Sequence, residues 1–243
     1  MNKFLKYLVI SLLISFPVSA EKSKLPKCEG DDYTKWSDCF AKIKFPRIEY
    51  EGEWKNGMFD GKGTAKDTNG TMIGQFEKNL MISGKVNFID GSSYEGEFKN
   101  DQFHGKGTFL ENNGSKYEGN FENGYYHGQG KLVTAETDVM EGEWKDGHLN
   151  GQGKITNHEG DIMIGEFKDS VLHGKGKHLN ANGDISEGNF RNGLLHGKSK
   201  YFWSGGEIYE GEWQKGDLTG YGIFKDKLST YEGTFVKSFY HGK

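Results

Sequence analysis

The stretch that decides the fold is Tyr94–Leu110, which reads YEGEFKNDQFHGKGTFL. It contains two glycine-centred elements, Tyr-Glu-Gly-Glu-Phe and His-Gly-Lys-Gly. In an extended backbone, Tyr94, Gly96 and Phe98 point to one face, and the two intervening glutamates point to the other. On the second element, Gly105, Gly107 and Phe109 share a face in the same way. The stretch therefore predicts two neighbouring strands with one aromatic face and one charged face.

This unit recurs along the chain every 22 or 23 residues, and an aromatic residue stands two positions after the central glycine of each first element. Those glycines are Gly52, Gly74, Gly96, Gly119, Gly142, Gly165, Gly188, Gly211 and Gly233. The first glycines of the second element are assigned to Gly61, Gly84, Gly105, Gly128, Gly151, Gly174, Gly197, Gly220 and Gly242. Turn dipeptides such as Asn56-Gly57 separate the two elements, and others such as Asn113-Gly114 separate the repeats. Because Asn-Gly readily adopts positive φ angles, each repeat is predicted to be one β-hairpin.

The mid-strand glycines indicate how the hairpins pack. Glycine normally weakens a strand, but here it leaves room for an aromatic ring of a neighbouring strand to lie across the backbone. We expect such a ring over Gly142, in the repeat that contains Trp144. No single hairpin can bury its aromatic residues alone, so stability is expected to depend on neighbouring repeats. These patterns predict an all-β fold of about eighteen strands, arranged as an elongated array of hairpins.

The recurring unit resembles the MORN repeat (membrane occupation and recognition nexus) over residues 49–243. The resemblance implies an elongated, twisted single-sheet β-hairpin solenoid of about nine repeats that serves as a platform for protein contacts, with lipid binding proposed for some members. Met72-Ile73-Gly74, Val86 in place of a second glycine, Ser186 and Ser199 depart from the pattern, so local distortion or a partner-specific surface is expected there. The positions taken as structural are Tyr50, Gly52, Trp54, Tyr94, Gly96, Phe98, Tyr117, Gly119, Phe121, Gly142, Trp144, Tyr209, Gly211 and Trp213.

The first 48 residues are different in character. Residues 1–20 combine two lysines, a ten-residue apolar run and small residues before Glu21, which predicts a cleaved secretory signal peptide and export to the periplasm or beyond. In an oxidising compartment, the isolated pair Cys28 and Cys39 is most simply a disulfide, although half of a metal site is the alternative. Residues 21–48 are interpreted as a half-repeat that caps the first sheet edge, and they resemble the cysteine-bracketed lead-ins of some exported bacterial members.

Composition and motifs exclude several function classes. With 31 basic and 35 acidic residues, the net charge of −4 is unlike that of a generic nucleic-acid binder. His104, His127, His173, His196 and His241 recur at one repeat position, but equivalent positions lie about 9–10 Å apart, too far to share one zinc ion. No nucleophile arrangement stands outside the repeats, so we expect no enzyme activity, cofactor or metal.

Two functions remain open from the sequence. The first is a non-enzymatic exported scaffold that binds or assembles protein partners whose identity the sequence does not indicate. The alternative is a cell-surface module in which exposed aromatic rings contact carbohydrate or membrane lipid. A homodimer joined tail to tail through an open edge near residues 231–243 is also expected, because unpaired strand edges promote pairing.

Overall fold

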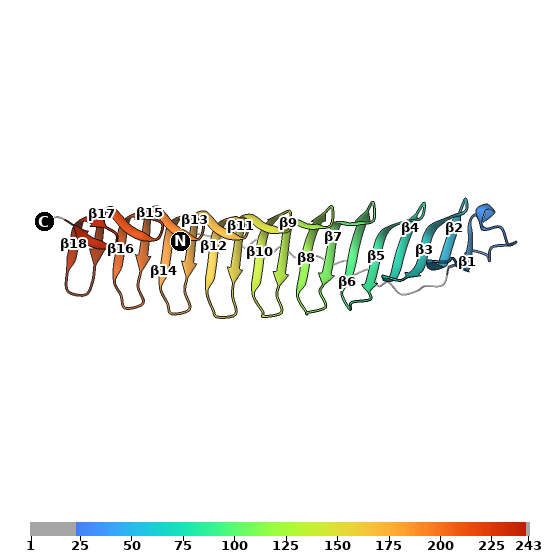
Figure 1. Cartoon of the computed structure of the whole chain (residues 1–243), viewed down its shortest axis with the longest axis horizontal. Coiled ribbons are helices and arrows are strands. Elements are labelled where there is room, and N and C mark those ends of the chain that lie inside the picture. The colour runs from blue at the N-terminus through green and yellow to red at the C-terminus, as the bar shows by residue number, and fades with distance from the viewer. Residues whose placement is uncertain (1–22, 242–243) are drawn as a thin grey trace, which may run out of the picture.

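The computed structural model describes residues 23–241, which form one antiparallel sheet of nineteen strands. Each strand pairs with the next along the chain, so the hairpins stand side by side along one long axis (Figure 1). The elements are η1 (Tyr33–Lys35), β1 (Cys39–Lys44), β2 (Ile48–Lys55), β3 (Met58–Asp67), β4 (Gly70–Glu77), β5 (Leu80–Phe88), β6 (Ser93–Lys99), β7 (Gln102–Leu110), β8 (Lys116–Glu122), β9 (Tyr125–Val133), β10 (Val139–Lys145), β11 (His148–Thr156), β12 (Ile162–Lys168), β13 (Val171–Leu179), β14 (Ile185–Arg191), β15 (Leu194–Phe202), β16 (Ile208–Gln214), β17 (Asp217–Lys225), β18 (Thr230–Val236) and β19 (Phe239–His241). The predicted all-β hairpin array is therefore confirmed.

Two kinds of turn alternate along the sheet. The two-residue turn at the tip of each hairpin has positive φ at both positions, as at Asn56 (51°) and Gly57 (71°). These are the angles of a type I′ turn, whose twist matches that of paired strands. The loops that join hairpins are longer: in residues 157–161, the Gly160 N–H donates to the Asn157 carbonyl, and Gly160 has φ 101°. This geometry is that of a type I turn followed by a left-handed residue.

Each hairpin from β2–β3 to β16–β17 is bent across its middle by a bulge. In the first hairpin, Gly52 pairs with Gly63, but Trp54 already pairs with Phe59, so β3 advances four residues while β2 advances two. The extra residues centre on Gly61, whose φ of 107° favours glycine. We call the part between bulge and tip the tip limb, and the part between bulge and inter-repeat loop the stem limb. The bend brings the limbs together, since the Phe59 ring stacks on Tyr50 at 3.8 Å between centroids.

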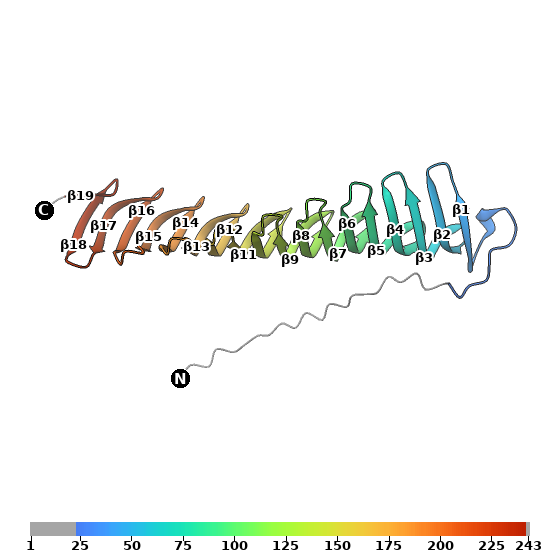
Figure 2. The same ribbon diagram turned by 90° about the horizontal axis from the view of Figure 1, so that it is seen from below.

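The bent hairpins follow one another along the array (Figure 2). The core lies between their two limbs and runs along the array. Tyr50 and Tyr117 of the stem limbs are fully buried. Each is also covered edge-on by the next repeat, as Tyr117 is by Trp144 at 5.4 Å. A second column, which the sequence analysis did not single out, supplies the opposing surface from the tip limbs. Its members are Phe59, Met81, Phe103, Tyr126, Leu149, Leu172, Leu195 and Leu218.

The glycines accommodate these rings only where a tyrosine is present. A Cβ added at Gly107 would lie 2.6 Å from the Tyr94 ring, and one at Gly96 would meet the hydroxyl of the same tyrosine. At Gly142, however, the added Cβ would meet main-chain atoms of the next strand, including the Gly153 Cα at 2.6 Å. The prediction of an aromatic ring over Gly142 is therefore wrong, because Met140 replaces the tyrosine and no ring lies there.

The second repeat is built differently from the others. Gly84 pairs with Gly74 and Gly96, so it corresponds to the second glycine of other repeats and not to the first, as the sequence analysis assigned it. Val86 therefore does not replace a glycine; it pairs with Tyr94 in the row of core residues. The shorter bulge coincides with a division of the core into two clusters, one ending at Val86 and one beginning at Tyr94.

Ser186 and Ser199 compensate for each other. Ser186 occupies the position of the core tyrosine, and Ser199 occupies the position of the second glycine. Both are buried, and the Ser199 hydroxyl lies 3.4 Å from the Asn189 carbonyl and accepts the Asn189 N–H at 3.0 Å. In the repeats with a core tyrosine, the tyrosine hydroxyl donates to the carbonyl at this position, as Tyr94 does to Glu97 at 2.9 Å. The two departures thus form a core pair and do not create a surface.

The first sheet edge is covered by the preceding segment. Lys27 forms a parallel bridge with Phe40, and the Cys28 N–H donates to the Phe40 carbonyl at 3.0 Å. Cys28 and Cys39 form the expected disulfide. Trp36 packs edge-on against Trp54 at 5.1 Å and extends the core to this end. The predicted signal peptide at residues 1–20 lies outside the described residues.

Candidate interaction surfaces

The repeat positions predicted from the sequence form the inside of the array. All the structural tyrosines and tryptophans among them are buried: Tyr50, Trp54, Tyr94, Tyr117, Trp144, Tyr209 and Trp213. Burial raises the pKa of the Tyr94 hydroxyl above its ordinary value of 10.0. The alternative function, a ligand-binding module that uses the aromatic face, therefore finds none of these seven rings exposed, because the bent sheet closes over them.

The glutamates of the first element have two separate roles. The first glutamate of each pair lies on the outer face of the stem limb, and three of them pair with a lysine of the neighbouring strand, as Glu141 does with Lys131 at 2.6 Å. The second glutamate turns back to the bulge, where the Glu97 carboxylate accepts the Lys106 N–H at 3.1 Å. This bond satisfies a backbone donor that the bulge leaves without a strand partner.

The histidine column lies beside the bulges. The Nδ1 atoms of His104, His127 and His196 are buried without a hydrogen-bond partner among the described residues. His127 Nε2 lies 3.2 Å from the Glu122 carboxylate. Within residues 23–241, no group of three or more His, Cys, Asp or Glu side chains could hold a metal ion.

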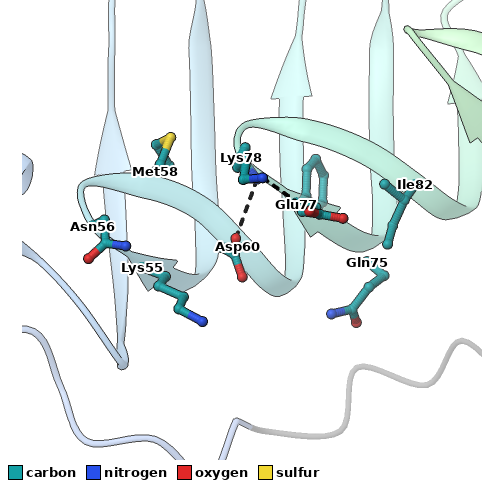
Figure 3. A pocket seen from close by; sticks show the side chains of 9 residues that line it. Lys55, Asn56, Met58, Asp60, Gln75, Glu77, Lys78 and Ile82 are labelled. Atoms are coloured by element: carbon teal, nitrogen blue, oxygen red, sulfur yellow. Dashed lines mark hydrogen bonds and ion pairs between the residues drawn. The ribbon is translucent and has the colours of Figure 1, made fainter.

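A shallow hollow of about 480 Å³ separates the tips of the first two hairpins (Figure 3). Its walls combine apolar groups of Met58, Phe76 and Ile82 with charged groups of Asp60 and Lys78. The Lys78 N–H donates to the Asp60 carboxylate at 3.4 Å. The hollow lies where the second repeat has its shortened bulge, and it combines both charges with apolar groups on an open surface.

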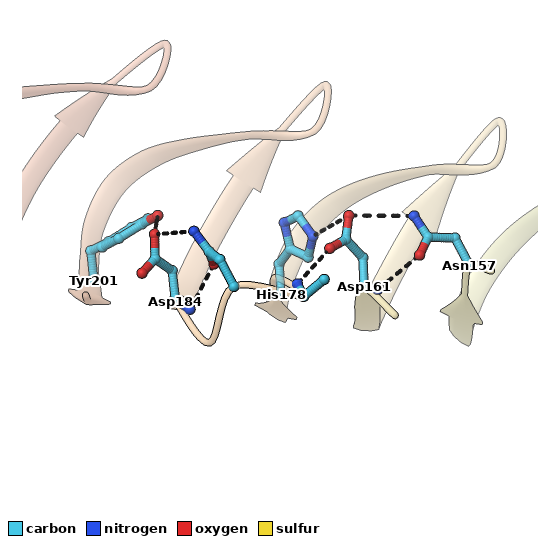
Figure 4. Close-up of polar contacts among 7 residues, drawn as sticks. Asn157, Asp161, His178, Asp184 and Tyr201 are labelled. Atoms are coloured by element: carbon cyan, nitrogen blue, oxygen red, sulfur yellow. Dashed lines mark hydrogen bonds and ion pairs between the residues drawn. The ribbon is translucent and has the colours of Figure 1, made fainter. Parts of the chain in front are cut away.

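The inter-repeat loops are tied to one another by a carboxylate ladder. Asp138, Asp161 and Asp184 each accept a backbone N–H from the next loop, at 2.8, 2.7 and 2.8 Å. Figure 4 shows how half-buried side chains join this ladder from the stem limbs. The Tyr201 hydroxyl donates to Asp184 at 2.9 Å, and His178 Nε2 lies 3.8 Å from Asp161. His158 pairs with Asp138 at 2.8 Å, and this contact raises the pKa of His158 and lowers that of Asp138.

Exposed apolar side chains gather at the tips of the hairpins. They occupy the first residue after the type I′ turn, and they include Leu80, Tyr125, Val171, Leu194 and Phe239. Phe239 is 76% exposed and Tyr125 is 60% exposed. These residues, and not the rings of the repeat motif, are the hydrophobic groups that the tips offer to a partner. Among the described residues, no helix has the length and apolar character needed to cross a membrane.

Comparison with known proteins gives a family match and two structural likenesses. The family model described as "MORN repeat" matches residues 50–72, 94–116, 117–136, 141–162, 164–185, 187–208, 209–227 and 231–243, and it omits the atypical second repeat. No curated protein matches the chain. A solved structure of the SAS-4 (dCPAP) TCP domain of Drosophila melanogaster, in complex with a proline-rich motif of Ana2 (dSTIL), is 11% identical over 88% of this chain and 99% of that chain, with a TM-score of 0.35. Streptogramin B lyase is 11% identical over 81% of this chain and 86% of that chain, with a TM-score of 0.18.

Proposed function

Because the chain belongs to the MORN-repeat family, whose repeats are generally protein- or membrane-interaction modules, we propose that it is a non-enzymatic, exported scaffold that binds or assembles protein partners. The observation that carries the proposal is the contrast between the two sides of the sheet. The aromatic repeat residues are buried in the core, whereas the outer face and the tips present regular rows of accessible side chains. Such a periodic surface suits the binding of an extended partner.

Export is the second part of the proposal. The Cys28–Cys39 disulfide is compatible with an oxidising compartment. The test is mass spectrometry of the protein recovered from its native host. An amino-terminal peptide that begins at Glu21 supports export through a cleaved leader, and recovery of intact Met1 with free thiols contradicts it.

The scaffold function is tested by retention on immobilised protein. The bait is the full chain, and the control bait is the Gly119→Val variant, whose new side chain would meet the Gly130 Cα backbone and disturb the sheet. Envelope proteins retained by the first bait and lost from the second support the scaffold. Retention on glycans or liposomes with no captured protein contradicts it and favours a surface-ligand module.

The tail-to-tail homodimer is a separate proposal. Val236, Phe239 and Tyr240 of β18 and β19 are all more than two-fifths exposed, at 46%, 76% and 58%. A second copy would remove this apolar surface from water. Light scattering at several concentrations tests it: a mass that rises from one chain to two supports the dimer, and a constant single-chain mass contradicts it. The variant Phe239→Lys is expected to stay monomeric.

A further inference from the structure

A row of side chains that is apolar at seven of its eight positions crosses the outer face of the sheet, opposite the core. Its members are neighbours in strand register from β9 to β16, and all are half-buried. In order they are Val133, Val139, Thr156, Ile162, Leu179, Ile185, Phe202 and Ile208. None belongs to the core clusters, which take the alternate residues of the same strands, such as Met140, Met163 and Tyr209. We call these eight residues the outer row.

The outer row is a local feature and is not required by the fold. At the same register position, the first repeats carry Lys44, Glu49, Lys66, Thr71 and Asn87. Beyond Ile208 the row becomes polar again at Lys225. Hydrophobic residues therefore replace polar ones at seven of eight consecutive strands, and Thr156 is the exception; the eight strands span about 34 Å at ~4.8 Å per strand. A contiguous apolar patch on an otherwise polar face marks an interaction site.

Charge differs between the two borders of the outer row. On the loop side, residues 134–138, 157–161, 180–184 and 203–207 contain six carboxylates and no lysine or arginine. The six are Glu136, Asp138, Glu159, Asp161, Asp184 and Glu207, and His158 is paired with Asp138. On the opposite border, lysines and glutamates alternate except at Ile164 of β12. Several of them pair with each other, as Lys177 does with Glu187 at 3.5 Å and Lys200 with Glu210 at 2.9 Å.

This arrangement selects one kind of occupant. The row runs across the strands, whose backbone groups are already paired in the sheet, so an added strand finds no partners there. A helix laid along the row matches it, because an amphipathic helix presents a narrow apolar stripe, and ~23 residues at 1.5 Å each span the same length. The acidic loops favour lysine or arginine along one side of that helix and disfavour anionic lipid.

We propose that the outer row of β9–β16, with its acidic loop border, is the docking site for an amphipathic partner helix that carries basic residues along one edge. The proposal rests on the proposed scaffold function and names its partner-binding face. The tip residues of the same hairpins are not part of this site.

The first test measures binding of a defined probe to the full chain. The probe is a fluorescently labelled 24-residue amphipathic helix of leucine and lysine, and its counterpart replaces every lysine with glutamate. At physiological salt, we expect the lysine peptide to bind at least tenfold more tightly. The double variant Ile162→Lys and Phe202→Lys, which copies the lysines of the first repeats, should lose at least tenfold in affinity for it. The matched control, Val171→Lys and Leu194→Lys at the tips, should bind as the unchanged protein does.

Equal affinity for the two peptides, or an equal loss in the outer-row and tip variants, would overturn the proposal. Circular dichroism of both double variants checks that each keeps its sheet. The charge-reversed variant Glu136→Lys and Glu159→Lys adds an independent measure, since it should weaken the lysine peptide and strengthen the glutamate peptide. Unchanged affinities in that variant would also count against the site.

The second test uses the native environment. A photo-crosslinking residue is placed at Leu179 in the outer row or, as the control, at Leu194 in a tip, and the crosslinked peptide is sequenced. A segment with helical apolar spacing and basic residues, joined at Leu179, supports the proposal. A lipid adduct, a peptide of this same chain or a segment without that pattern overturns it. If protein is captured at Leu194 alone, the scaffold function is supported but the outer row is not its binding site. If no protein is captured at either position, the scaffold function itself is contradicted.

Discussion

Exchanging a core tyrosine and its glycine for a pair of serines tests how the limbs pack. Gly107→Ser alone places a side chain against the Tyr94 ring, at 2.6 Å from its Cε2 and Cζ atoms. This ring has no exposed surface and stacks on Phe103 at 3.8 Å, so it has nowhere to move. Overpacking of this kind costs about 1–3 kcal/mol. Tyr94→Ser alone removes a buried ring and the hydroxyl bond to Glu97, for about 3–5 kcal/mol.

The double variant reproduces the pair at Ser186 and Ser199, where the Ser199 hydroxyl lies beside the Asn189 carbonyl. In the repeats with a core tyrosine, the tyrosine hydroxyl donates to the corresponding carbonyl. Its cost should therefore be at least ~1 kcal/mol below the sum of the single costs, a coupling typical of residues in contact. Hydrogen exchange of β6 and β7 is the measurement, because repeat arrays need not unfold in one step. Additive costs would refute the account. The reverse pair provides the matched control: Ser186→Tyr should be tolerated only together with Ser199→Gly.

Three further predictions follow from the caps, the tyrosines and one strained loop. The disulfide closes a loop with a sequence separation of 11, so replacing Cys28 and Cys39 with serine should destabilise the first strands by about 3 kcal/mol and leave hydrogen exchange in β16–β18 unchanged. An equal loss of hydrogen-exchange protection along the whole array would contradict a local cap. Burial raises the pKa of Tyr94 above 10.0, so the contribution of this tyrosine to stability is complete below pH 10 and is lost as the pH rises further. Circular dichroism and absorbance at 295 nm should therefore show tyrosine ionisation and unfolding together, and a tyrosine titration that is complete before unfolding would contradict this prediction. Thr137 has φ 72° at a position where neighbouring loops carry glycine, so Thr137→Gly should stabilise the protein by up to about 1 kcal/mol and raise its thermal midpoint. A lowered midpoint would contradict backbone strain at Thr137.

The periodicity of the sequence was sufficient to predict the hairpins, their turns and the antiparallel sheet. Strand alternation correctly placed Tyr94, Gly96 and Phe98 on one face, because side-chain direction in a strand depends only on position. The turns at Lys78-Asn79 and Lys237-Ser238 were harder to foresee, since they adopt type I′ angles without an Asn-Gly pair.

The bend of each hairpin could not be predicted from alternation. A flat sheet would leave its aromatic residues exposed, and this assumption led to the interpretation of the rings as a ligand surface. A signal was nevertheless present, because an apolar residue stands two positions before the first glycine of most second elements, as Phe103 does before Gly105. The assignment of Gly84 failed for a related reason: without the bulge geometry, a missing residue and a replaced glycine look alike in the sequence.

The irregular second repeat has a mechanical consequence. Between β5 and β6, strand pairing extends only from Ser83–Glu97 to Asn87–Ser93, and the core passes from one cluster to the other through half-buried Phe88 and Phe98. We therefore expect two stiffer segments in series, one made of the cap with the first two hairpins and one made of the remaining hairpins. Bending and torsion of the rod should concentrate at the junction between β5 and β6. This junction would then set the angle between a partner bound to the first segment and a partner bound to the second.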